Sequence, residues 1–212
     1  MAWIATVPLR MTLVFCVMVL AGCSGLGRGG EKPPETVEVA SRSVVIGGPT
    51  GYCVDRGASR LVGESPFVLL GSCASIAGDR SAGTPARLGV LTASVSAPGG
   101  PSFAETLPQL ETFFRSPPGR AALARDGNDL SVTVLSAEAQ GDVLIVHLND
   151  TSANVVPGIA SEYWRALFEV NGRLVTLSVM SFDEAPMGPD ASQRTIRRFI
   201  ERIRRESPAI AS

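Results

Sequence analysis

Apolar and polar residues alternate along several stretches of the chain. Alternation with a period of two sends successive side chains to opposite faces of a strand. It occurs at residues 36–46, 86–96 and 130–136. The continuous apolar run at 66–72 has the length and composition of a buried strand. These four segments are predicted as strands.

Two longer strand patterns follow in the second half of the chain. One is residues 142–150, DVLIVHLND, and the other is residues 162–182, which are long enough for two strands. Asn171-Gly172 separates the two alternating halves of the second segment. Because Asn-Gly is the strongest short-range hairpin signal, we expect a type I′ turn there.

Apolar residues recur with helical spacing before residue 130. Leu110, Phe113 and Phe114 form an i, i+3, i+4 face. Pro108 is predicted in the first turn of this helix, where its missing N–H costs nothing. A second short helix is expected after Ser116.

The last helical pattern covers residues 190–207. Asp190 and Gln193 have the spacing of a capping box, so Asp190 is predicted to cap this helix. The apolar residues share one face, and they are Ile196, Phe199, Ile200 and Ile203. The pattern therefore predicts an amphipathic C-terminal helix.

The order of these elements is strands, helices, antiparallel strands and a final helix. That order predicts an α+β domain in which helices pack against a single twisted, mostly antiparallel sheet. A late hairpin followed by a C-terminal helix resembles, in shape, the PsbP-like group of small α+β domains. The chain also resembles a set of uncharacterised alphaproteobacterial envelope lipoproteins.

The N-terminal residues have a different pattern. Arg10 precedes an apolar run, 11–20, that is shorter than the about 20 residues needed to span a bilayer core. A short run of this kind is typical of a secretory signal peptide rather than of a membrane-spanning or buried helix. The run ends in Leu20-Ala21-Gly22-Cys23, which resembles the lipobox of bacterial lipoproteins. The resemblance implies cleavage before Cys23 and lipidation of Cys23.

Lipidation implies a location. Two or more acyl chains hold a protein firmly on a membrane, and Ser24 in place of Asp points, in this family, to the periplasmic face of the outer membrane. Residues 24–34, SGLGRGGEKPP, lack apolar periodicity and are expected to form a flexible tether that reaches at most about 35–40 Å. The predicted organisation lists a signal peptide at 1–22, a lipidated N-terminus and tether at 23–35, one α+β domain at 36–207 and a tail at 208–212.

The cysteines follow from this location. Cys16 leaves with the signal peptide and Cys23 carries lipid, so Cys53 and Cys73 remain in an oxidising compartment. We expect one disulfide between them, which closes a loop of about 20 residues and is worth about 3 kcal/mol. The other interpretations need groups that the sequence does not supply. A zinc site needs about four ligands, and a catalytic thiol needs a neighbouring histidine or a CxxC motif.

Composition excludes one large class of function. Basic and acidic residues number 19 and 20 among 212, so the chain lacks the strong basic excess of nucleic-acid-binding proteins. The glycine-rich stretch at 47–51 has no Lys-Ser/Thr ending of a phosphate-binding loop and is predicted as a plain loop. No cofactor and no metal ligand set is predicted.

Catalytic chemistry has few candidates. His147 is the single histidine, Asp150 lies three residues further on, and the G-x-S-x-G motif of serine hydrolases is absent. Asp183 and Glu184 are carboxylates of the type that cleaves glycosidic bonds, but adjacent acids in a loop are usually solvated. No residue is predicted to be catalytic. The alternative function is a cofactor-free envelope hydrolase that acts on cell-wall or ester substrates.

The polar side of the C-terminal helix is a candidate interaction surface. It carries Arg194, Arg197, Arg198 and Arg205, with Arg202 and Arg204 at its margins. Guanidinium groups suit the recognition of phosphate and carboxylate. A solvated face whose last-turn cations stabilise the helix dipole is the simpler interpretation. The predicted function is a non-enzymatic binding or assembly domain, with an envelope protein or an anionic envelope polymer as its partner.

Overall fold

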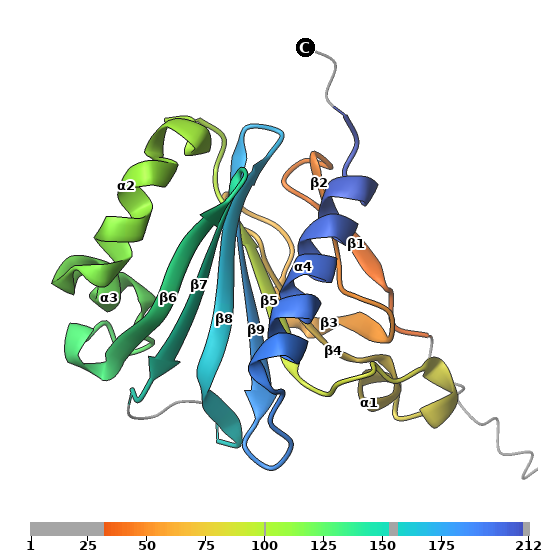
Figure 1. The fold of residues 1–212 in the computed structure, drawn as a ribbon. Coiled ribbons are helices and arrows are strands. Elements are labelled where there is room, and N and C mark those ends of the chain that lie inside the picture. The colour runs from red at the N-terminus through yellow and green to blue at the C-terminus, as the bar shows by residue number, and fades with distance from the viewer. Residues whose placement is uncertain (1–31, 100, 153–156, 210–212) are drawn as a thin grey trace, which may run out of the picture.

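Nine strands and four α-helices make up the described part of the chain (Figure 1). The strands are β1 Thr36–Val39, β2 Val44–Gly47, β3 Tyr52–Arg60, β4 Phe67–Ser72, β5 Val90–Val95, β6 Val132–Gln140, β7 Val143–Asp150, β8 Ile159–Val170 and β9 Arg173–Phe182. The helices are α1 Cys73–Ala77, α2 Phe103–Arg115, α3 Pro117–Leu123 and α4 Pro189–Glu206. Two short 3-10 turns span Arg80–Ala82 and Asp129–Ser131.

This computed structural model describes residues 32–99, 101–152 and 157–209. The predicted signal peptide, the lipobox and Cys23 lie outside these residues. Among the helices of the described ranges, none is long and apolar enough to cross a membrane.

Seven strands form one antiparallel sheet in the order β3-β4-β5-β9-β8-β7-β6. β1 and β2 pair separately as a small second sheet. The α+β class and the C-terminal helix predicted from the sequence are confirmed. The structure differs from the prediction in having two sheets instead of one.

Two apolar cores lie on opposite faces of the large sheet. In β7, Ile145 is buried together with α4 and the β1-β2 hairpin. Its neighbours Leu144 and Val146 are buried together with α2 and α3. Because successive strand residues point to opposite faces, β7 is apolar on both sides, and helices cover both faces of this part of the sheet (Figure 1).

The segment 36–46, predicted as one strand, is a hairpin. Ala40, Ser41 and Arg42 all have positive φ, from 54° to 68°, and Val39 pairs with Val44. The prediction was wrong because no glycine or Asn-Gly pair signals this turn. Folding back places valine or isoleucine residues from both strands in the core under α4.

The later hairpin has the predicted geometry. Asn171 and Gly172 have φ values of 54° and 69°, and Val170 pairs with Arg173 across the turn. Both central residues are left-handed, as a type I′ turn requires. The turn predicted from the sequence is confirmed.

Both long helices begin at residues other than those expected. α2 starts at Phe103, so Pro108 lies inside the helix and not in its first turn. Phe103 and Leu107 are buried in the core under α2, and this burial extends the helix by a turn at the expense of the hydrogen bond that Pro108 cannot make. α4 starts at Pro189 with Gly188 as its N-cap and no side-chain cap, so the predicted capping by Asp190 is wrong.

The buried face of α4 matches the prediction. Ile196, Phe199 and Ile203 are 0% exposed and Ile200 is 6% exposed. A helix that buries one stripe so completely is fixed in rotation about its axis. The positions of the arginines on its other sides are therefore set by the apolar pattern.

Candidate anion-binding groove

A groove of about 670 Å³ runs along one side of α4. Its other wall consists of the β2-β3 loop with the start of β3, and of residues 84–87, which precede β5. Five arginines line it, and we name it the arginine groove after them: Arg87, Arg194, Arg198, Arg202 and Arg205. The sequence places these walls more than 100 residues apart, and the fold brings them together.

Three of the four predicted surface arginines of α4 line this groove. Arg194, Arg198 and Arg205 lie at i, i+4 and i+11, which places them on one side of a helix. Arg197 does not share that side and instead lines a small hollow of about 120 Å³ next to Ile145. The predicted surface is thus divided, and Arg197 lies outside the arginine groove.

Arg202, predicted at the margin of the surface, is occupied by contacts within the protein. Its guanidinium donates to the Gly48 carbonyl at 2.7 Å, to Glu206 at 2.9 Å and to Glu35 at 3.4 Å. Hydrogen bonds from Lys32 and then from Arg202 hold the pKa of the Glu35 carboxyl below its usual value. Arg202 therefore fixes the groove wall and leaves little capacity for a ligand.

Three other arginines of the groove are available. Within residues 32–99, 101–152 and 157–209, the side chains of Arg87, Arg194 and Arg198 make no ion pair and no hydrogen bond. Arg205 is exposed and lies 3.7 Å from Glu206. Among the described residues that line the groove, Glu201 is the one carboxylate. Although the chain has a net charge of −1, the groove is locally cationic and attracts anions.

Tyr52 holds the wall opposite α4 in place. Tyr52 is 2% exposed, and its hydroxyl donates to the Arg87 carbonyl at 2.7 Å. Burial raises the pKa of the Tyr52 phenol well above its usual value, so the hydroxyl stays a neutral donor. The backbone that carries Arg87 is thus tied to the core.

Close backbone contact joins the two loops of that wall. Gly51 has φ +87°, and a Cβ atom there would lie 2.5 Å from the backbone nitrogen of Pro85. Only glycine fits this combination of left-handed backbone and close approach. The sequence interpretation of 47–51 as a plain loop missed this packing role.

A disulfide anchors the same wall. Cys53 and Cys73 are bonded, as predicted, with their Cα atoms 4.8 Å apart. The Cys73 amide also donates to the Gly51 carbonyl at 2.9 Å. The bond therefore ties the end of the 48–51 loop to the start of α1.

His147 lies away from the groove, on β7. Its Nε2 is 2.7 Å from Glu162 Oε1, and its ring stacks on Trp164 with centroids 4.2 Å apart. In the described part of the chain, no hydroxyl or thiol hydrogen-bonds His147. The arrangement pairs a histidine with a carboxylate and supplies no adjacent nucleophile.

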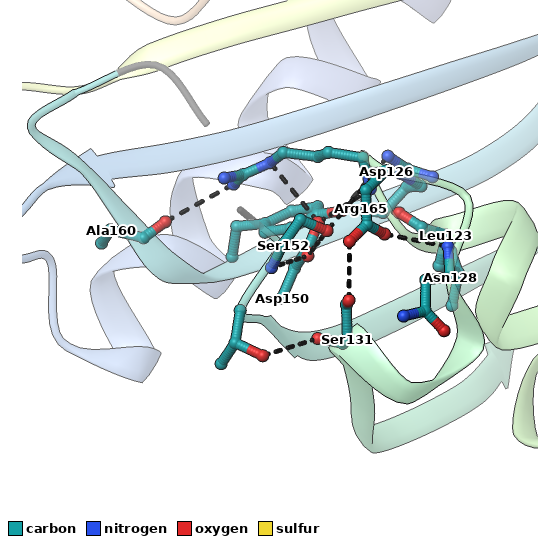
Figure 2. A network of polar contacts seen from close by, with 11 residues as sticks. Leu123, Asp126, Asn128, Ser131, Asp150, Ser152, Ala160 and Arg165 are labelled. Atoms are coloured by element: carbon teal, nitrogen blue, oxygen red, sulfur yellow. Dashed lines mark hydrogen bonds and ion pairs between the residues drawn. The ribbon is translucent and has the colours of Figure 1, made fainter. Parts of the chain in front are cut away.

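The other catalytic candidates are also separated from one another. Asp150 is 1% exposed and accepts hydrogen bonds from the amides of Arg125 and Ser152 at 3.1 and 2.9 Å (Figure 2). Those bonds fasten the end of β7 to the loop after α3, which is a structural role. Asp183 and Glu184 are exposed in the turn after β9 and do not line the groove.

Sequence comparison gives no family. No protein-family model matches the chain, and no curated protein matches it. Among solved structures, the chain is similar to the solution structure of cyanobacterial PsbP (CyanoP) from Synechocystis sp. PCC 6803. The identity is 11%, the match covers 91% of this chain and 99% of that chain, and the TM-score is 0.38. A similarity of this size carries no argument about function.

Proposed function

We propose that this protein is a non-enzymatic envelope binding protein whose arginine groove holds an anionic partner. In this proposal a lipid on Cys23 attaches it to the periplasmic face of the outer membrane. One observation carries the binding role: Arg87, Arg194 and Arg198 line one groove from two walls, and none of them forms an ion pair with a carboxylate of the described residues. Neighbouring like charges repel, and a bound anion relieves that repulsion.

Two adjacent arginines provide a matched test. Arg198 lines the arginine groove and Arg197 does not, yet both are exposed on the same helix and carry the same charge. We expect Arg198→Glu to reduce crosslinking to the envelope partner in cells and Arg197→Glu to leave it unchanged. Exposed charge changes usually alter stability by no more than about 0.5 kcal/mol, so both variants should melt like the parent.

Salt provides a second readout of the same proposal. Exposed charges are screened within about 8 Å at physiological ionic strength. Capture of the partner by the parent protein should therefore weaken as salt rises, while the residual capture by Arg198→Glu should depend less on salt. Two results would contradict the proposal. One is an equal loss of partner capture in Arg198→Glu and Arg197→Glu, and the other is capture that persists in Arg198→Glu and in high salt.

A further inference from the structure

We infer that the ligand of the arginine groove is a phosphate ester, whose phosphate is held between the two walls by Arg87, Arg194 and Arg198. This inference rests on the proposed function and specifies the anion. The source of the ester, a lipid headgroup or a soluble molecule, is left to the test because both present the same chemistry.

The placement of the cations favours phosphate over carboxylate. Arg194 and Arg198 come from α4, whereas Arg87 comes from the facing wall. A phosphate offers three strong acceptor oxygens in different directions, so it accepts from both walls at once. A carboxylate has two oxygens in one plane, which fit the fork of a single arginine.

The size and lining of the groove favour an ester over a bare ion. Its volume of about 670 Å³ is within the range of about 300–1,000 Å³ for small-molecule sites. Apolar groups lie beside the arginines, including Pro49, Pro85 and Ala191. Inorganic phosphate has no apolar part to contact these groups, whereas the organic part of an ester can pack against them.

Glu201 limits how much negative charge the groove accepts. It lies three residues after Arg198 on α4, a rise of about 4.5 Å, and it lines the same groove. A carboxylate repels a second anionic group there and accepts a hydrogen bond from a hydroxyl or an ammonium group. The groove therefore selects a single phosphate with a hydroxyl- or amine-bearing neighbour over a polyanion.

The inference can be tested by NMR on the full chain in neutral-detergent micelles. The protein is titrated with sn-glycerol 3-phosphate, and the amide signals of residues 84–87 and α4 are followed. Glycerate is the carboxylate counterpart, tripolyphosphate is the polyanion, and micelles that contain phosphatidic acid present the lipid form. Arg87→Ala and Arg198→Ala should each weaken glycerol phosphate binding about tenfold, and Arg197→Ala should not change it. Glu201→Gln should strengthen tripolyphosphate binding more than glycerol phosphate binding.

The outcomes separate this inference from the proposed function. Preference for glycerol phosphate or phosphatidic acid over glycerate, lost in Arg87→Ala, supports the phosphate site, and the better of the two probes identifies the source. Equal binding of glycerate, or indifference to Arg87→Ala, overturns the phosphate inference and leaves a groove that binds anions through α4. Failure of every anion to bind overturns both, provided that thermal melting shows the variants to be folded.

Discussion

Tyr52 connects the core to the arginine groove through one hydrogen bond, and its ionisation gives a test of that burial. Tyr52 and Tyr163 are the two tyrosines of the chain, and burial raises the pKa of both. Above about pH 10 the unfolded chain loses phenolic protons that the folded chain keeps. Stability is therefore fully present below pH 10 and falls as the pH rises further, by up to about 1.4 kcal/mol per pH unit for each tyrosine.

Tyr52→Phe should remove one of these two contributions. Urea unfolding between pH 9 and pH 11 should show a smaller loss of stability with pH than in the parent protein. Tyr163→Phe serves as the comparison, and the double variant should be nearly insensitive to pH in this range. A parent-like slope in Tyr52→Phe would show that the phenol ionises freely in the folded state.

At the residue scale, the sequence predicted the α4 wall of the arginine groove but not the facing wall. Arg194 and Arg198 could be assigned to one side of a helix because the apolar stripe fixes the rotation of α4. Arg87 and Tyr52 could not be assigned, because loop positions have no periodicity. Arg197 could not be separated from the others by sequence, because helical spacing alone does not show which side of α4 the facing wall covers.

At the scale of elements, a hairpin could be predicted only where its turn residues favour the backbone conformation of the turn. Asn171-Gly172 specifies its turn through residues that tolerate left-handed backbone. The β1-β2 turn uses Ala40, Ser41 and Arg42 in the same backbone region. This turn is stabilised by the burial of both strands in the core. Because the turn residues themselves do not favour it, the local sequence does not predict it.

The disulfide between β3 and α1 should support both stability and binding. Replacing Cys53 and Cys73 together by serine should lower the free energy of unfolding by about 2–4 kcal/mol. The 48–51 loop loses this anchor, so anion affinity of the arginine groove should fall as well. Chemical denaturation and anion titration of the double variant measure the two effects. Unchanged stability, or two freely alkylated thiols in protein taken from cells, would contradict this role.

Gly51 offers a test of the same wall with a matched control. Gly51→Ala puts a Cβ atom 2.5 Å from Pro85 in a left-handed backbone, whereas Gly63 has φ +104° and no atom of the described residues within 4 Å of its Cβ position. Both variants carry backbone strain of about 1–2 kcal/mol, but only Gly51→Ala forces the two loops apart. Gly51→Ala should therefore be the less stable variant and bind anions more weakly. Equal melting temperatures and affinities for the two variants would count against close packing at Gly51.

At the scale of the whole molecule, the groove lies beside the point where the chain enters the described domain. Glu35 directly precedes β1 and pairs with Arg202 of the groove at 3.4 Å. In the proposed organisation, Cys23 is the lipidated residue and the tether follows it. Pro33 is buried and the Pro34 carbonyl accepts a hydrogen bond from the Val54 amide at 2.7 Å, so the tether predicted to end at residue 34 ends earlier and reaches less than about 35–40 Å. The anchor would thus hold the start of the domain, and the arginine groove beside it, near the membrane, where anionic headgroups are concentrated.

This arrangement depends on Cys23, which can be tested against a second cysteine of the N-terminal region. Cys23→Ser should abolish lipidation and maturation, because the lipobox modification is made on the cysteine thiol, and the protein should leave the detergent-soluble membrane fraction. Cys16→Ser, within the apolar run, should leave processing unchanged because that residue is removed with the signal peptide. Membrane fractionation and mass spectrometry of the N-terminal peptide distinguish the outcomes. Normal fractionation of Cys23→Ser, with no lipid on the parent peptide, would remove the anchor and with it the proximity of the groove to the membrane, while the anion site on α4 would remain to be judged by its own variants.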